Sequence, residues 1–335
     1  MWLLRKIAFP FSLMYALAVY VRNKLYDIGV LTSEHYETPT ICVGNLSVGG
    51  TGKTPMIEYL IRYFGHSHQI AVLSRGYRRK SKGFVLAAST STVEELGDEP
   101  YQIHFKFPEV RVAVDSDRRN GIVQLQKRVG PDLILLDDAF QHRRVKADMN
   151  ILLTSFESLY IDDWYLPSGN LRDGLSQVNR AQYVVVTKCP ENLSLSEKDQ
   201  IKRKLGVQDT KTILFSYLKY DGELRSEGAP LPLQDLSGKR VTLVTGIANP
   251  EPFVHYLKSK GITIDHMAFK DHHFFTSREI ASFKTKELLV TTEKDYVRLK
   301  GKVANLYYLP IRHVFFEEDE AVLLSGLEGF MMPNP

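Results

Sequence analysis

The chain has 335 residues, 44% of them hydrophobic and 24% charged, which is an ordinary globular composition and leaves room for two domains whose cores need no metal or disulfide. Its net charge of +4 is weak, and no basic run carries interleaved aromatic residues, so we expect no nucleic-acid partner. Only two cysteines are present, Cys42 and Cys189, which argues against a zinc site and for a reducing compartment.

The N-terminal stretch, residues 1–26, is apolar and aromatic and has no acidic residue. Its basic residues are Arg5, Lys6, Arg22 and Lys24. Residues 7–21 are uncharged, and as a helix they would span about 22 Å, short of a hydrocarbon core of about 30 Å. No small-residue cleavage site of a signal peptide follows. We therefore predict an interfacial, membrane-associated helix within residues 1–30, with a soluble helix packed on the surface as the alternative.

From Thr40 onward, short apolar runs alternate with amphipathic stretches, which is the pattern of βαβ units. The runs are rich in Val, Ile and Leu without strict alternation, so they predict parallel strands covered on both faces. Predicted strands are Thr40–Gly44, Ile70–Ser74, Val110–Val114, Leu133–Asp137, Asn150–Thr154 and Tyr183–Thr187. Helices are predicted between them, for example at Lys53–Phe64 and Asp115–Arg128.

The pattern changes at residues 212–238, where two extended segments about Asp221 are followed by a Pro/Gly-rich stretch. A second alternating set then predicts strands at Val241–Thr245, Ile262–Phe269, Glu287–Thr291 and Leu306–Pro310, with helices near Glu251–Lys260 and Ser277–Phe283. The predicted fold class is therefore α/β. A P-loop NTPase-type parallel sheet domain at 31–211 is joined by a short β hairpin linker at 212–238 to a smaller α/β domain at 239–335.

Ser47–Thr54 matches the phosphate-binding pattern G-x-x-x-x-G-K-[ST] except that Ser47 replaces the first glycine. A predicted strand precedes the loop and an amphipathic helix follows it. In that context backbone N–H groups would hold a β-phosphate, Lys53 would reach the β- and γ-phosphates, and the Thr54 hydroxyl would bind Mg²⁺. The predicted nucleotide-binding residues are Ser47, Val48, Gly49, Gly50, Thr51, Gly52, Lys53 and Thr54. A glycine turn of structural purpose only is the alternative.

The stretch DLILLDDAFQH ends a buried strand in Asp137 and Asp138, which is a Walker-B pattern. A carboxylate at the carboxyl end of a strand beside the P-loop strand can coordinate Mg²⁺ directly or through water. We predict Asp137 and Asp138 as metal ligands, with Glu99 as a further candidate. A helix cap is the weaker interpretation, because two aspartates occur together downstream of a P-loop.

Acids and histidines that could act on a hydroxyl occur at two distant places. GDEP puts Asp98 and Glu99 in a predicted turn between strands, and FKDHHFF puts Asp271, His272 and His273 after a predicted strand of the second domain. A carboxylate hydrogen-bonded to a histidine makes a general base for an alcohol. Spacing alone does not pair them, and each on its own is more often a turn cap or a surface residue.

Two basic loops, SRGYRRK at 74–80 and QHRR at 141–144, follow strands at the carboxyl edge of the predicted sheet. Ligands of α/β proteins bind at this edge. We expect the side chains of Arg79 and Lys80 to be solvated at the surface. Arg75, within Ser-Arg-Gly-Tyr, is a candidate site residue.

Together these motifs resemble the lipid A 4′-kinases, or tetraacyldisaccharide 4′-kinases, which are membrane-associated enzymes of outer-membrane lipid assembly. The matching stretches are VGNLSVGGTGKTP, LSRGY, GDEP, DDAFQH, LPSGNLRD, TGIANPEPF, DHH and TTEKD, in family order from Val43 to Asp295. They cover nearly the whole chain. Ala139 stands where the family has glycine, and Asp173 stands where many members have glutamate, so any role of Asp173 is carried by a shorter side chain.

The resemblance implies transfer of the γ-phosphate of ATP, with Mg²⁺, to the 4′-hydroxyl of a tetraacylated glucosamine disaccharide 1-phosphate in a cleft between two α/β/α domains. Asp98 takes the position of the catalytic base, and a histidine of DHH, His272 ahead of His273, that of its partner. With Lys53 and Arg75 they form the predicted catalytic set. The implied location is the cytoplasmic face of the bacterial inner membrane, with the acylated lipid and the membrane surface as partners and no obligate protein partner.

A second class of function stays open, namely a membrane-surface P-loop NTPase that acts as a switch or chaperone without a small-molecule acceptor. The P-loop and the Walker-B strand fit it equally well, and VVVTKCP at 184–190 resembles the base-reading turn of some GTPases. DHH and TTEKD favour the kinase, because a simple switch does not need them. Phosphate release that depends on a lipid acceptor would separate the two.

Overall fold

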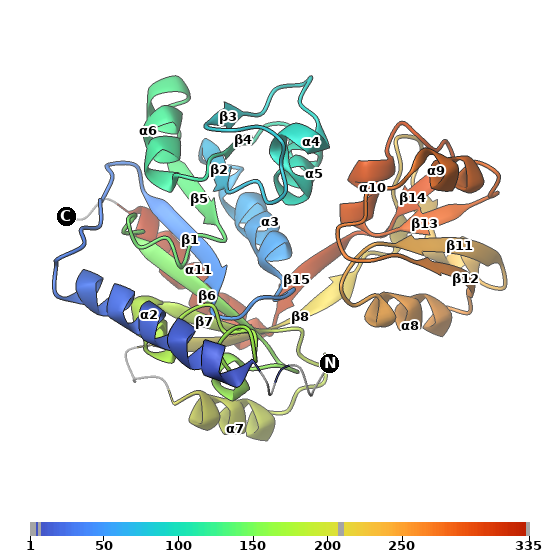
Figure 1. Ribbon diagram of the computed structural model, residues 1–335. Helices are drawn as coiled ribbons and strands as arrows, with labels where there is room; N and C mark the ends of the chain where they lie inside the picture. The colour runs from blue at the N-terminus through green and yellow to red at the C-terminus, as the bar shows by residue number, and fades with distance from the viewer. Residues whose placement is uncertain (1–4, 6–7, 207–210, 333–335) are drawn as a thin grey trace.

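The larger of two main sheets has nine strands in the order β15-β8-β7-β6-β1-β5-β2-β4-β3 (Figure 1), in a computed structural model that describes residues 5, 8–206 and 211–332. Its strands are β1 (Thr40–Asn45), β2 (Ile70–Ser74), β3 (Val85–Leu86), β4 (Arg111–Val114), β5 (Leu133–Asp137), β6 (Met149–Ser155), β7 (Tyr183–Thr187), β8 (Thr212–Tyr220) and β15 (Ile311–Phe315). Neighbours run parallel except β3 on β4 and β15 on β8. The predicted α/β fold class is confirmed.

The smaller sheet is parallel throughout, in the order β12-β11-β13-β14, and forms a separate body on the right of Figure 1. Its strands are β11 (Arg240–Thr245), β12 (Thr263–Ala268), β13 (Leu289–Thr291) and β14 (Leu306–Tyr308). A two-stranded ribbon, β9 (Glu223–Leu224) with β10 (Leu231–Pro232), precedes it. We call the bodies built on the two main sheets the large unit and the small unit.

Helices cover both sheets. In the large unit they are α2 (Phe9–Asp27), α3 (Lys53–Phe64), α4 (Val93–Leu96), α5 (Asp98–Lys106), α6 (Arg118–Arg128), α7 (Leu195–Leu205) and α11 (Glu317–Met331). In the small unit they are α8 (Glu251–Ser259), α9 (Ser277–Phe283) and α10 (Glu293–Leu299). Single 3₁₀ turns occur at Tyr160–Asp162, Leu175–Arg180 and Leu233–Leu236.

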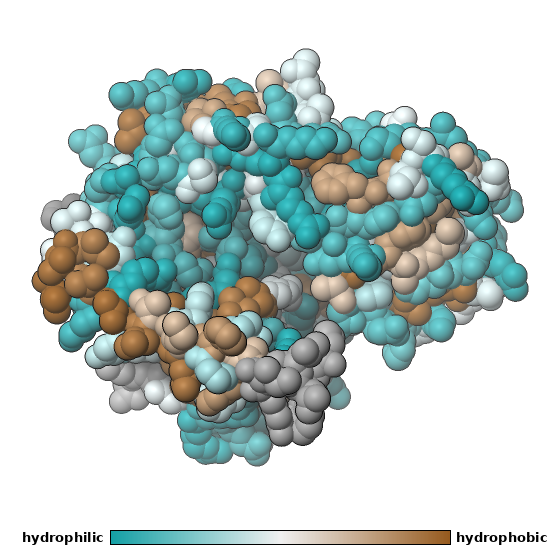
Figure 2. All heavy atoms as spheres, viewed as in Figure 1, coloured by the Kyte–Doolittle hydropathy of each residue, from teal (hydrophilic) through white to brown (hydrophobic). Residues whose placement is uncertain are grey.

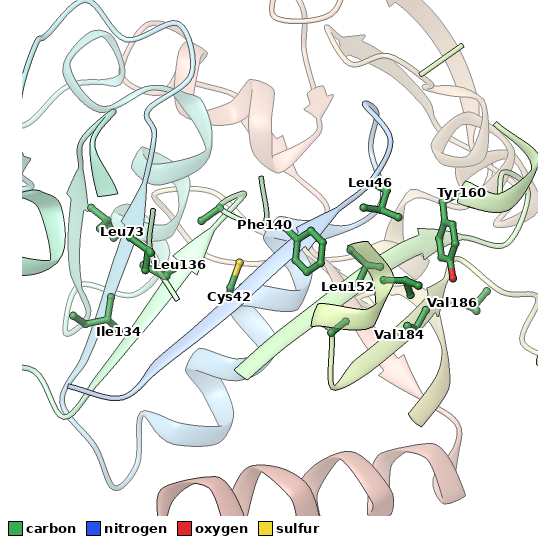
Figure 3. Close-up of a cluster of buried hydrophobic side chains, with 14 of the residues drawn as sticks. Cys42, Leu46, Leu73, Ile134, Leu136, Phe140, Leu152, Tyr160, Val184 and Val186 are labelled. Carbon is green, nitrogen blue, oxygen red and sulfur yellow. The ribbon is translucent and has the colours of Figure 1, made fainter. Parts of the chain in front are cut away.

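The core of the large unit lies on both faces of its sheet, because alternate residues of each buried strand point to opposite sides. On β1, Cys42 belongs to the cluster of one face, together with Phe140 and Val186 (Figure 3). Ile41 and Val43 belong to the other face, which α3 and α11 cover. The predicted covering on both faces explains why these strands lack a polar–apolar alternation.

The connection between the two units differs from the predicted hairpin. β8 is an inner strand of the large sheet and pairs in parallel with β7, whereas its antiparallel partner is β15, which returns from the small unit. β15 and the following α11 therefore belong to the large unit, although they lie within the predicted second domain at 239–335. A pairing between strands almost 100 positions apart leaves no local signal in the sequence.

Asp98 does not lie in a turn, as predicted, but begins α5. The turn is made one residue earlier by Gly97, whose φ of 87° is in the region that favours glycine. Acidic residues at a helix start complement the partial positive charge of the free N–H groups, and proline is tolerated in the first turn. The sequence Gly-Asp-Glu-Pro is thus a helix start.

α2 lies along the surface of the large unit and turns Ser12, Val19 and Asn23 inward, whereas Lys24 and Asp27 are exposed. Ser12 and Asn23 are buried, whereas most apolar side chains of the helix face solvent. The exposed ones are Phe9, Phe11, Leu13, Met14, Leu17, Tyr20 and Val21, and they form the brown area at the lower left of Figure 2. Among the described residues no helix is long and apolar enough to cross a membrane. Lys6, also named in the prediction, lies outside those residues.

Candidate active site

The phosphate-binding loop joins β1 to α3 and is held by contacts on its outer side. The side-chain amide of Asn45 donates to Thr51 Oγ1 at 2.9 Å, and Thr187 Oγ1 donates to the Thr51 carbonyl at 2.8 Å. The Val48 amide donates to the Asn170 carbonyl at 2.8 Å. Among the described residues, the N–H groups of Lys53 and Thr54 at the start of α3 have no backbone hydrogen-bond partner, so they can face an anion.

Lys53 and the second Walker-B aspartate lie together at this loop. Lys53 Nζ is 3.7 Å from Asp138 Oδ1, and Arg172 donates to both carboxylate oxygens of Asp138, at 3.0 and 2.7 Å. Burial alone would raise the pKa of Asp138, but Lys53 and Arg172 outweigh it and hold that pKa well below its usual range. Arg172 also contacts the side chain of Asn45. It comes from the NLRD stretch, which sequence reasoning quoted without giving Arg172 a role.

Asp137, the last residue of β5, is the more deeply buried of the pair. Its Oδ2 accepts a hydrogen bond from Ser74 Oγ at 2.9 Å, whereas Oδ1 is buried and has no partner in the described part of the chain. Burial, with the negative charges of Glu99 and Asp138, raises the pKa of Asp137 to about 7. A buried carboxylate oxygen without a donor is costly unless a ligand satisfies it.

Asp98 and His272 meet across the two units. His272 Nδ1 is 2.8 Å from Asp98 Oδ2, although the residues are 174 positions apart. An ionised carboxylate can only accept, so Nδ1 carries the hydrogen, and His272 Nε2 accepts from Lys294 Nζ at 3.1 Å. The structure thus brings together the pair that the resemblance implied and that spacing alone could not join.

A buried arginine of α10, Arg298, is the other partner of Asp98. Arg298 Nε donates to Asp98 Oδ1 at 2.9 Å, and its Nη2 contacts Oδ2. Its Nη1 donates to Asp295, which in turn accepts from the Gly246 amide at 2.8 Å. Burial would raise the pKa of Asp98, but Arg298 and His272 outweigh it and hold that pKa far below its usual range. Asp295 lies within the quoted TTEKD motif, whereas no local pattern marks Arg298.

The neighbouring histidine has a different environment. His273 Nε2 contacts the carboxylate of Glu279 at 3.0 Å, and the ring stacks on Phe269. His272 has a φ of 59°, in the left-handed region that residues other than glycine seldom adopt. Of the two candidates, only His272 contacts Asp98.

Lys294 links the acids of this cluster. Its Nζ lies 3.7 Å from Glu99 and 3.6 Å from Asp271, in addition to the contact with His272. Glu99 also contributes to the raised pKa of Asp137, so its charge acts on the Walker-B strand as well as on Lys294. Sequence reasoning gave Lys294 no role, although it is the lysine of TTEKD.

The other predicted residues lie at the same edge of the large sheet. Arg75 directly follows β2, next to the serine that donates to Asp137, and its side chain is exposed. Thr54 is half-buried in the first turn of α3, and Ser47 Oγ is buried without a partner among the described residues. Val48, Gly49 and Gly50 are exposed at the tip of the loop.

Asp173 anchors α2 beside this site. The carboxylate is fully buried and accepts from Asn23 Nδ2 at 2.6 Å and from Arg22 at 3.1 Å. Tyr15 of the same helix donates to the carbonyl of Arg172 at 3.0 Å. Asp173 therefore joins α2, which carries the exposed apolar face, to the segment of Arg172 that holds Asp138.

The chain is similar to known proteins over nearly its whole length. A family model described as tetraacyldisaccharide-1-P 4′-kinase matches residues 4–328. The chain is 50% identical over 332 residues to a tetraacyldisaccharide 4′-kinase of Flavobacterium johnsoniae, with 97% of each covered. It is 45% identical to that of Bacteroides thetaiotaomicron, with 99% of this chain and 94% of that protein covered.

A solved structure has the same fold over nearly the full length. The crystal structure of LpxK from Aquifex aeolicus in complex with ATP aligns with a TM-score of 0.82 at 31% identity, covering 98% of this chain and 100% of that one.

Proposed function

The chain belongs to the tetraacyldisaccharide 4′-kinase family, and from that membership we propose that it transfers the γ-phosphate of ATP to the 4′-hydroxyl of a tetraacylated glucosamine disaccharide 1-phosphate, a step of lipid A biosynthesis. The observation that carries this proposal is the Asp98–His272 hydrogen bond of 2.8 Å. It gives a chain that also has a P-loop a candidate base for an alcohol. A nucleotide switch has no use for such a base.

ATP is the nucleotide that the loop would hold. The free N–H groups at the start of α3 would bind the β-phosphate, and Lys53 would reach the transferring group. Val48, Gly49 and Gly50 at the tip are exposed to an incoming nucleotide. We propose Arg75, exposed at the end of the neighbouring strand β2, as a further cation for phosphate oxygens.

Mg²⁺ fits the residues at the Walker-B strand. No group of three or more Asp, Glu, His or Cys side chains among the described residues could hold a metal alone. That is compatible with Mg²⁺, which proteins usually bind through one or two carboxylates, phosphates and water. Asp137 Oδ1, buried without a partner in the described part of the chain, is the first candidate ligand, and Thr54, Asp138 and Glu99 are the other proposed ones. The ion would neutralise charge on the β- and γ-phosphates.

Asp137→Asn should raise the Mg²⁺ concentration needed for half-maximal activity about tenfold or more, a loss of roughly 1.4 kcal/mol in metal affinity. Asp138→Asn should have a smaller effect, because Lys53 and Arg172 already occupy that carboxylate. Mn²⁺ binding, followed by electron paramagnetic resonance with ATP present, gives a readout independent of turnover. Equal Mn²⁺ affinity in the wild type and both variants would mean that neither aspartate binds the metal, and Glu99 would be the next candidate ligand.

Asp98 and His272 are proposed to act as one unit that removes the proton of the acceptor hydroxyl. Both oxygens of Asp98 already accept hydrogen bonds, and Arg298 keeps the carboxylate ionised. Asp98 therefore fixes the Nδ1–H tautomer of His272 and stabilises positive charge on the ring when the unit takes a proton. Lys294 must release His272 Nε2 before that nitrogen can face a hydroxyl.

The site needs both units, so we propose that they are two domains whose cleft is the active site. Asp98 belongs to α5 of the large unit, and His272 and Arg298 belong to the small unit. An acceptor bound in the cleft would complete the site, which would limit hydrolysis of ATP by water. The proposed division keeps residues 31–211 and 239–310 as the two bodies and adds β8, β15 and α11 to the first.

The exposed apolar face of α2 is proposed to lie in a membrane interface at the cytoplasmic side of the inner membrane, where ATP is available. Seven exposed large apolar side chains on one helix would be an unusual surface in water. Trp164, 60% exposed, extends this face through its contact with Phe9. Because α2 also contacts the segment that holds Asp138, acyl chains in the membrane would lie near the site that receives their headgroup.

Membrane fractions should release the protein with detergent but poorly with high salt, because burial of apolar side chains is not screened by ions. The triple variant Phe11→Ser, Met14→Ser, Leu17→Ser should shift it largely to the soluble fraction. Leu195→Ser, at an exposed leucine of α7, is the matched control and should stay bound. Quantitative release by salt alone would show that the attachment is electrostatic.

The alternative, a membrane-surface NTPase without a small-molecule acceptor, predicts a different dependence of phosphate release. A switch would hydrolyse ATP at a rate set by a protein partner or by the membrane. The kinase should consume ATP in proportion to the disaccharide lipid supplied, and vesicles without that lipid should not stimulate it.

A further inference from the structure

A buried histidine of the connecting strand contacts the phosphate-binding loop. His313 lies in the middle of β15, and its side chain is almost fully buried. β15 and its antiparallel partner β8 are the two strands by which the chain enters and leaves the small unit (Figure 1). Neither the P-loop motif nor the catalytic cluster described above includes this residue.

Each ring nitrogen of His313 has one defined partner. Nε2 is 2.9 Å from the carbonyl oxygen of Gly52, and Nδ1 is 3.1 Å from Ser216 Oγ on β8. A carbonyl can only accept, so Nε2 carries the hydrogen of a neutral ring and Nδ1 accepts from the serine hydroxyl. Burial lowers the pKa of His313 to about 4, which keeps the ring neutral.

Gly52 is the residue where the loop becomes a helix. It has a φ of 88°, and its carbonyl also accepts the first helical hydrogen bond, from the Met56 amide at 3.1 Å. A Cβ at this position would lie only 2.9 Å from His313 Nε2. The contact between loop and strand therefore requires glycine both for backbone conformation and for space.

The same strand is packed against the helix that follows the loop. Phe315 of β15 meets Tyr59 of α3 edge to face, with ring centroids 5.1 Å apart. Toward the small unit, Ile311 pairs with Tyr220, the last residue of β8. The loop is thus fixed to the strand pair that carries the small unit, and His313 makes the polar contact between them.

We propose that His313 is a positioning residue that fixes the phosphate-binding loop against the connecting strand through the Nε2–H bond to Gly52, and so sets the affinity for nucleotide phosphates. The inference rests on the proposed binding of ATP at this loop. A variant that loses the bond from Nε2–H to Gly52 should bind ATP about three- to tenfold more weakly, because the bond joins two neutral, buried groups.

Two variants distinguish the contact made by Nε2 from the contact made by Nδ1. In His313→Gln the amide nitrogen is as many bonds from Cβ as Nε2 and can still donate to Gly52. In His313→Asn the amide is as far out as Nδ1, so it can contact Ser216 but falls short of the loop. The dissociation constant for ATP is measured by calorimetry without acceptor, together with the melting temperature of each protein.

The Asn variant should bind ATP about three- to tenfold more weakly, and the Gln variant should stay within about twofold of the wild type, with similar melting temperatures for both. Equal ATP affinities in the two variants would overturn the proposal. If the Asn variant does not fold, Ser216→Ala tests the same bond, because the ring loses the partner that orients it; unchanged affinity there also overturns it. A wild-type protein that fails to bind ATP would contradict the proposed function instead.

Discussion

Lys53→Ala is expected to lower kcat by about 10³-fold or more in a protein that still folds. Lys53 starts α3 with its ammonium group 3.7 Å from Asp138, where it can neutralise charge that develops on the transferring phosphoryl group. Removing one aligned donor from such a site costs roughly 10²- to 10³-fold, and a charged group at the transferred phosphate should cost at least that. Arg172 still pairs with Asp138 in the variant, so the fold should tolerate the change.

The measurement is steady-state turnover with saturating acceptor, alongside a thermal unfolding curve. Lys127→Ala is the matched control, because Lys127 is an exposed lysine of α6 away from the loop, and its turnover should equal that of the wild type. Near-normal turnover of a folded Lys53→Ala protein would end the assignment of Ser47–Thr54 as the nucleotide site.

Asp98→Ala is expected to lower kcat by roughly 10²- to 10⁴-fold with little change in ATP affinity, the range for loss of general-base help to an alcohol. His272→Ala should lower kcat by a similar factor, because its Nε2 is the nitrogen that would face the hydroxyl. The double variant should be little worse than Asp98→Ala, since residues that act as one unit are strongly non-additive. If the kcat of the double variant instead falls by the product of the two single losses, the hydrogen bond between Asp98 and His272 has no part in the reaction.

Two further variants serve as controls for this comparison of single and double variants, because loss of folding would also lower turnover. Asp98→Ala leaves the buried Arg298 with Asp295 as its remaining carboxylate, and breaking such a buried ion pair can cost about 3–5 kcal/mol of stability. Asp98→Asn keeps an oxygen that can accept from His272 Nδ1 but removes the charge, and it should lose turnover with less loss of stability. His273→Ala is the control for the neighbouring ring, which contacts Glu279, and should keep most of its activity.

The parts of the site that could be predicted are those whose chemistry is local in sequence. A strand, a glycine loop and a helix starting at Lys53 follow one another directly, so pattern and structure coincide over Thr40–Phe64. Asp137 and Asp138 end a buried strand, and any pair so placed reaches the same sheet edge. The comparisons with known proteins then confirm the family that these motifs resemble.

The parts that were missed are partners supplied from elsewhere in the chain. Arg298 reaches Asp98 from 200 positions away, and His313 reaches Gly52 from 261. Neither lies in a motif, because a single arginine or histidine on a helix or strand has no periodic or composition signal. The pairing of β15, from the predicted second domain, with β8 also has no local signal, since it is set by tertiary packing.

Phosphoryl transfer to the lipid tests the central proposal most directly. The purified protein is incubated with γ-labelled ATP, Mg²⁺ and a tetraacylated glucosamine disaccharide 1-phosphate in mixed micelles, and the lipid is extracted and its phosphorylated position mapped by mass spectrometry. The wild type should place one labelled phosphate on the 4′-hydroxyl of each disaccharide, and Lys53→Ala should place almost none. Labelled phosphate released to water at the same rate with and without the lipid, with no label in the extracted lipid, would contradict the assignment as a kinase.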